Sequence, residues 1–135
     1  SGTKRRLLGL CVSALAATIV VHVAFLPRYL PGAFTRGFPF LAIAWGSYLL
    51  FFYGLGRLRP PADGMPNMRS TDLGAALFLF AIVVSCLLDT AGLTVEAAPF
   101  AHVLPALGVY VGLAFAGWGF GVRTGAVNKI AAETD

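Results

Sequence analysis

Charged residues are scarce in this sequence. They make up 12% of the 135 residues, whereas hydrophobic residues make up 58%. A soluble domain carries about 25% charged residues, which cover its surface in water. With so few charges and a mean hydropathy of +0.80, this chain cannot cover a soluble surface, so lipid must surround much of it. We therefore expect residues 1–135 to form a single integral membrane domain.

Cysteine is scarce as well, and the common motifs of enzyme chemistry are absent. The two cysteines, Cys11 and Cys86, lie inside apolar runs and form no Cys-x-x-Cys pair, which excludes zinc ribbons and thioredoxin-like sites. No Ser-His-Asp order, His-Glu-x-x-His or glycine-rich phosphate loop occurs. Basic residues never run five in a row, which excludes nucleic acid as a partner. These absences weigh against an enzyme.

Four apolar segments are present, and each reaches the length of about 20 residues that a membrane helix needs. They cover residues 7–26, 38–58, 73–92 and 97–122. The first has the basic start of a signal peptide and a cleavage-like Ala14-Leu15-Ala16 triplet, but its apolar run continues past the triplet. We expect it to be a retained helix. The sequence thus predicts an all-α, four-helix transmembrane bundle.

Several residues predict where these helices begin and end. Pro27 is expected to end the first helix, and Ser70-Thr71-Asp72 to supply the N-cap of the third. Pro99 fits the first turn of the fourth helix, whereas Pro105 is expected to kink it. After Arg123 the chain is expected to fray.

The basic residues are divided unevenly between the two ends of the predicted helices. Only Arg28 and Arg36 lie at one end, in the first connection. Eight lie at the other end: Lys4, Arg5, Arg6, Arg57, Arg59, Arg69, Arg123 and Lys129. Cytoplasmic ends of membrane proteins carry the excess of Lys and Arg. Both termini are therefore expected on the cytoplasmic-type side, in a bacterial or archaeal cytoplasmic membrane or an organelle inner membrane.

The fourth segment is rich in glycine and carries two ridges of small residues. One consists of Gly108, Gly112 and Ala116, and the other of Gly117, Gly121 and Gly125. Small residues at every fourth position let helix backbones approach closely in lipid. The ridges fit packing within the bundle, or one ridge can meet a partner subunit. Two ridges on different faces make the second interpretation more attractive than one ridge would.

Three ionisable residues within the segments are expected at a common depth. A rise of about 1.5 Å per residue places His22, Asp89 and His102 in the outer part of the bilayer, with Arg28 just above them. If their helix faces turn inward, the three residues form one polar cluster. Ionisable groups inside a membrane usually mark a functional site.

Such a cluster suits several chemistries. Two histidines can ligate the iron of a b-type haem or the magnesium of a chlorophyll-type pigment. A His–Asp pair can bind a quinone headgroup or pass protons, and Arg28 can hold an anionic lipid or substrate. The structural alternative is a His–Asp hydrogen bond that fixes helix packing, with Arg28 reaching toward the headgroups.

These observations favour a non-catalytic accessory or structural subunit of a larger respiratory, photosynthetic or transport complex. Its partners are expected to be membrane lipids and either other subunits or further copies of itself. A haem- or quinone-binding membrane anchor is the first alternative, and a small homo-oligomeric transporter or channel is the second. No ionisable residue lies at mid-membrane, which weighs against a coupled transporter that acts alone.

Overall fold

The computed structural model describes residues 2–29, 34–61 and 63–134, and most of these residues are helical. The elements are α1 (Gly2–Val20), the π-helical turn η1 (Val21–Phe25), α2 (Leu26–Tyr29), α3 (Phe34–Leu58), α4 (Arg69–Thr90), the 3-10 turn η2 (Pro99–His102) and α5 (Val103–Thr134). Because α1, η1 and α2 are continuous, as are η2 and α5, the chain has four helices that are long and apolar enough to cross a membrane.

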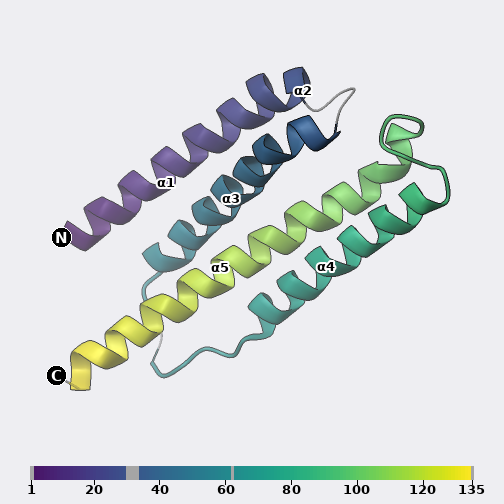
Figure 1. The fold of residues 1–135 in the computed structure, drawn as a ribbon. Coiled ribbons are helices and arrows are strands. Elements are labelled where there is room, and N and C mark those ends of the chain that lie inside the picture. The colour runs from purple at the N-terminus through teal and green to yellow at the C-terminus, as the bar shows by residue number, and fades with distance from the viewer. Residues whose placement is uncertain (1, 30–33, 62, 135) are drawn as a thin grey trace.

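The four long helices lie side by side in an open row, in the order α1, α3, α5, α4 (Figure 1). Within the described residues, α1 packs on α3, α3 packs on α5, and α5 packs on α4. The two helices at the edges, α1 and α4, do not pack on each other. The row therefore has two edges and two broad faces.

The buried part of this row is thin and centres on α5. Ala81 of α4 forms its core with Val109 and Leu113 of α5, and Trp45 and Leu49 of α3 pack against them. Large apolar side chains point away from the row on every spanning helix. In water such exposure would be costly, but acyl chains supply apolar neighbours in a membrane. The fold is therefore consistent with the composition of the sequence.

The first helix passes through Pro27 instead of ending there, so this predicted boundary is wrong. In a regular α-helix the proline ring would collide with the carbonyl group four residues earlier, at Val23. The π-helical turn η1 contains Val23 and immediately precedes α2. Its wider turn accommodates the proline, and the helix continues to Tyr29.

The other three helices also begin or end beyond their predicted bounds, and α3 already begins at Phe34. The fourth continues to Thr134, because residues after Arg123 form regular helix rather than a frayed tail. Its Pro105 lies in the first turn of α5, where a missing N–H breaks no helical hydrogen bond, so no kink arises in mid-helix. The third helix begins at Arg69, and its N-cap is Met68 without a side-chain hydrogen bond. The predicted capping cluster instead forms part of the first turn.

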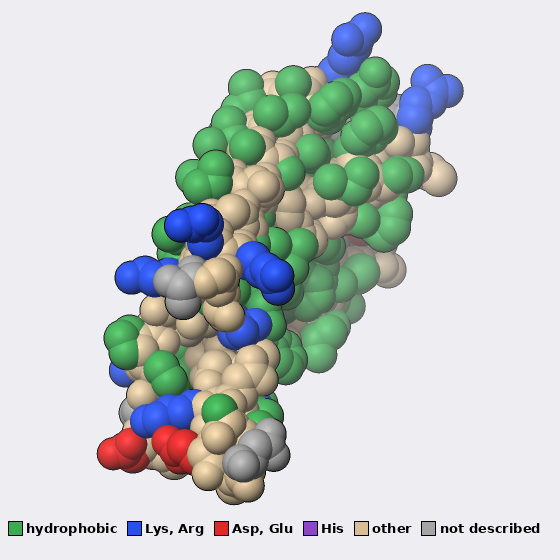
Figure 2. All heavy atoms as spheres, turned by 90° about the vertical axis from the view of Figure 1, so that its left-hand side faces the viewer, with side chains coloured by type: hydrophobic (Ala, Val, Ile, Leu, Met, Phe, Trp, Pro, Cys, Tyr) green, Lys and Arg blue, Asp and Glu red, His purple; other side chains and the backbone are tan. Residues whose placement is uncertain are grey.

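Both termini and the α3–α4 connection lie at one end of the molecule (Figure 1). Figure 2 views the molecule from this end and shows basic side chains gathered there, with acidic side chains near the lower edge. Hydrophobic side chains cover the surface behind them. At about 1.5 Å per residue, the 32 residues of α5 extend about 48 Å, more than the about 30 Å of a hydrocarbon core. The length of α5 therefore exceeds the thickness of that core.

Candidate functional site

His22 lies in the π-helical turn η1 and connects two helices through its ring. Its Nδ1 is 2.7 Å from the backbone oxygen of Thr18 on the same helix. Its Nε2 is 2.6 Å from the hydroxyl of Tyr110 on α5. A carbonyl oxygen can only accept a hydrogen bond, so we assign the ring proton to Nδ1, and Tyr110 donates to Nε2. Both ring nitrogens therefore have partners within the protein.

Aromatic side chains of α3 hold Tyr110 in place. The rings of Tyr48 and Tyr110 meet edge to face, with centroids 5.0 Å apart. Trp45 makes a side-chain hydrogen bond with Tyr110 and lies edge to face on Phe78 of α4. Edge-to-face contacts suit the charge distribution of aromatic rings. The network around His22 therefore extends from α1 across α3 to α5 and α4.

A lateral groove of about 310 Å³ lies beside this network. It is lined by Thr18, Ile19, His22, Val23, Tyr48 and Tyr110. The groove opens toward the surroundings of the helix row, which in a membrane are lipid. Its surface is apolar, because the polar atoms of His22 and Tyr110 are bonded to each other. Such a groove can accept an acyl or isoprenoid chain without breaking a hydrogen bond.

His102 occupies a second polar network, at the connection between α4 and α5. It is buried in the 3-10 turn η2, and its Nδ1 lies 2.9 Å from the hydroxyl of Ser85 on α4. Its Nε2 lies 2.7 Å from the backbone oxygen of Leu93. Nε2 therefore carries the proton, and Nδ1 accepts from Ser85. Both nitrogens serve to fasten the connection to α4.

In the described part of the chain, no hydrogen bond joins any two of His22, Asp89 and His102. The two histidines belong to separate hydrogen-bond networks. Asp89 is exposed on α4, and no described side chain forms a hydrogen bond or ion pair with its carboxylate. The described residues contain no group of three or more His, Cys, Asp or Glu that could hold a metal ion.

Arg28 lies apart from the histidines as well. It is exposed in α2, with its guanidinium 5.7 Å from the ring centroid of the adjacent Tyr29. The ring of Tyr29 stacks on Phe40 of α3, with centroids 4.6 Å apart. Arg28 thus lies at the end of the row opposite to the termini (Figure 1).

Both glycine ridges of α5 face helices of the same chain. A Cβ at Gly112 would lie 2.7 Å from the backbone of Gly74 and 2.7 Å from that of Phe78, both on α4. A Cβ at Gly121 would meet backbone atoms of Tyr53 and Arg57 on α3. The ridge of Gly108, Gly112 and Ala116 therefore packs on α4, and the ridge of Gly117 and Gly121 packs on α3, with Gly125 at its margin. Two ridges on α5 thus no longer favour a partner subunit.

Tyr110 is the site residue that the sequence analysis missed. Its hydroxyl is the partner of His22, yet its spacing relative to His22 in the sequence indicates no contact. The available signal is its place between Gly108 and Gly112 in an apolar helix. A tyrosine there must find a partner for its hydroxyl inside the membrane.

Comparisons of the chain with protein-family models, with curated proteins and with solved structures give no match. The geometry of the site is therefore the basis for the functional proposal.

Proposed function

We propose that this protein is a non-catalytic structural subunit of a larger membrane complex. The observation that carries the proposal is the open row of helices, in which α1 and α4 each pack on one neighbour only. Exposed apolar side chains such as Val12 on α1 and Phe80 on α4, each 67% exposed, leave both edges open to further helices. The polar groups of the site, by contrast, serve mainly to join the helices.

Native mass spectrometry after extraction in a very mild detergent tests this proposal. The 14.2 kDa chain is expected to appear together with other polypeptides, whose identities would then define the complex. A chain that appears alone, or only with copies of itself, contradicts the proposal. A photo-crosslinker at Val12 or at Phe80 then identifies which edge meets the partner, because these positions lie on opposite edges of the row.

A second candidate function is a membrane anchor that binds a lipophilic cofactor. The groove beside His22 favours it, since the groove is apolar and open to lipid. A quinone with an isoprenoid tail suits such a groove better than a haem or a chlorophyll-type pigment held by two histidines. Ligation by His102 would break its hydrogen bond with Ser85 or the one with Leu93, because each ring nitrogen holds one of them. A bound quinone mass in the same spectrum, lost in His22→Ala, supports this candidate, and its absence contradicts it.

The remaining candidate is a homo-oligomeric transporter or channel. The row joins neighbouring helices only, so a pore would have to lie between copies of the chain. A defined homo-oligomer that moves a solute into liposomes supports this candidate. A chain that assembles only with other polypeptides counts against it.

A further inference from the structure

Four arginines surround α5 at the end of the molecule that carries both termini. Arg57 lies in the last turn of α3, Arg59 just after it, Arg69 at the start of α4 and Arg123 on α5 itself. Because the backbone of α5 packs closely on α3 and on α4 here, the four arginines lie at a similar position along the helix axes. A Cβ at Gly119 would meet Thr71 of α4, and one at Gly121 would meet the backbone of Arg57.

Neutral groups orient three of these arginines. Nη1 of Arg57 donates to the hydroxyl of Tyr53 at 3.1 Å. The guanidinium of Arg59 lies over the ring of Trp118, 5.4 Å from its centroid. Nη1 of Arg123 lies 3.0 Å from the thioether sulfur of Met68, which is a weak acceptor. These contacts fix the positions of the side chains but leave their charges in place.

No carboxylate in the described part of the chain forms an ion pair with any of the four arginines. Lys129, at the same end, contacts Asp63 at 3.1 Å and Glu133 at 4.0 Å. The four positive charges of the arginines are therefore not neutralised by any described carboxylate. An unpaired guanidinium keeps most of its five donors for an external acceptor.

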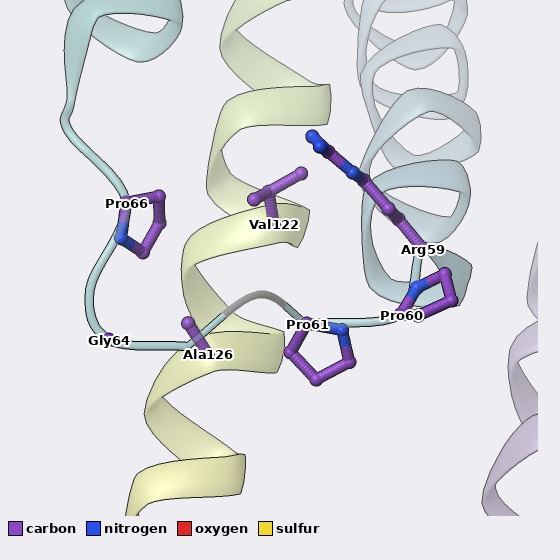
Figure 3. Close-up of a pocket in the computed structure, with 7 residues that line it drawn as sticks. All are labelled: Arg59, Pro60, Pro61, Gly64, Pro66, Val122 and Ala126. Carbon is purple, nitrogen blue, oxygen red and sulfur yellow. The ribbon is translucent and has the colours of Figure 1, made fainter.

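A small cavity of about 90 Å³ lies between α5 and the connection that follows α3. Figure 3 shows Arg59 reaching from the end of α3 toward α5, while Pro60, Pro61, Gly64 and Pro66 mark the path of the connection past Ala126. Besides Arg59, its lining consists of proline, glycine, valine and alanine, so a group bound there would have Arg59 as its charged partner.

We propose that this arginine cluster (Arg57, Arg59, Arg69 and Arg123) binds the phosphate headgroups of anionic phospholipids around this end of α5. Guanidinium groups match phosphate oxygens with paired hydrogen bonds, which lysine cannot do. The cluster lies beside Trp118 and Tyr53, and both residue types are common at the membrane–water boundary. Lipid headgroups occupy the same boundary. Exposed apolar side chains of the same helices, such as Leu55 and Phe120, continue below the cluster and offer a surface for the acyl chains.

The opposite end of the molecule provides a matched control. It carries Arg28 and Arg36, both exposed. Replacing this pair removes the same charge as replacing two arginines of the cluster, but leaves the cluster intact. The two double variants therefore separate a specific site from a general effect of net charge.

The experiment measures lipid binding to the purified, delipidated full chain by native mass spectrometry. Phosphatidylglycerol and phosphatidylcholine with identical acyl chains are titrated into the wild type, into R59Q/R123Q and into R28Q/R36Q. The wild type is expected to retain phosphatidylglycerol in preference to phosphatidylcholine. R59Q/R123Q is expected to bind phosphatidylglycerol at least about tenfold more weakly, because two headgroup contacts are lost, whereas R28Q/R36Q matches the wild type.

Three results would overturn the proposal: equal retention of the two lipids by the wild type, equal losses in both double variants, or displacement of phosphatidylglycerol by millimolar inorganic phosphate, which indicates a site for a free anion. Unchanged helicity by circular dichroism in R59Q/R123Q excludes misfolding as the cause of the loss. R59K/R123K provides a further readout. This variant keeps the charge but not the paired geometry, and it is expected to bind between the wild type and R59Q/R123Q.

Discussion

At the scale of single residues, both histidines are placed where their rings form hydrogen bonds within the protein. His22 and Tyr110 come from helices that do not pack on each other directly, and their side chains meet across α3. In lipid no water is present to replace a lost partner, so an unpaired ring nitrogen or hydroxyl is costly. This bond therefore connects the edge helix α1 to the centre of the row.

Substitution of Tyr110 tests the value of this bond. Tyr110→Phe removes the hydroxyl and leaves Nε2 of His22 without a donor. We expect the free energy of unfolding in detergent to fall by about 1 kcal/mol. Tyr48→Phe is the matched control, because the described residues offer no hydrogen bond to the Tyr48 hydroxyl. Equal effects of the two variants in a denaturant titration would show that the bond contributes nothing specific.

Sequence patterns identify polar residues such as His22 better than they identify the hydrogen-bond partners of those residues. His22 stands out as an ionisable group in an apolar segment, and it shares a helix face with Thr18, which indeed lies 3.1 Å from its ring. The bond to Tyr110 joins residues 88 positions apart. Which helices are neighbours decides such a bond, and the packing order α1, α3, α5, α4 cannot be read from the periodicity of any one segment.

At the scale of helices, α5 is built to be flanked on two sides. Its glycines bring the backbones of α3 and α4 to within van der Waals distance. Apolar side chains gain little from association in lipid, so close backbone contact replaces the hydrophobic effect as the source of stability. The two ridges of small residues in the sequence predict this close contact. They do not predict whether the neighbouring helices belong to the same chain.

An alanine at Gly112 tests this close packing. Its Cβ would lie 2.7 Å from backbone atoms of α4, which cannot rotate away as a side chain can. We expect the free energy of unfolding to fall by about 1–3 kcal/mol, as for other overpacked sites. Gly46→Ala on α3 is the control, since nothing lies within 4 Å of its Cβ position and alanine favours a helix. If both variants unfold like the wild type, the ridge is not under packing constraint.

The ends of the helices were less predictable than their number. Pro27 is a helix breaker by ordinary rules, yet the π-helical turn before it lets the helix continue. The last turns of α5 extend past the apolar segment because Asn128, Lys129 and Glu133 are compatible with helix in water. Hydropathy indicates only the part of a helix that lies in lipid. It therefore does not predict the helical residues that continue into water.

At the scale of the whole molecule, the charge distribution predicts an orientation. We expect the end that carries both termini to face the cytoplasm. Cysteines introduced at Val95 and at Ala132, in a chain with Cys11 and Cys86 replaced by alanine, report on the two ends. A membrane-impermeant maleimide is expected to label position 95 in intact cells and position 132 only after permeabilisation. The reverse pattern would contradict the orientation.

The open row also predicts that an edge helix can separate without loss of the rest. The contact of α1 with α3 depends on Gly54, whose Cβ position lies 2.5 Å from the sulfur of Cys11. A leucine at Gly54 would push α1 outward. Because α1 packs on α3 alone, the packing of α3 on α5 and of α5 on α4 is expected to survive. In a closed bundle, the same change would disturb every interface.

The reactivity of Cys11 measures this separation, because the thiol is buried, with 6% exposure, between α1 and α3. In a Cys86→Ala background, Gly54→Leu is expected to speed alkylation of Cys11 by N-ethylmaleimide at least about tenfold, which corresponds to about 1.4 kcal/mol less protection from opening. Gly9→Leu, with open space at its Cβ position, should leave the rate unchanged. If Gly54→Leu instead abolishes helicity throughout the chain, the row folds as one cooperative unit, and the edge at α1 cannot exchange its neighbour for a partner helix.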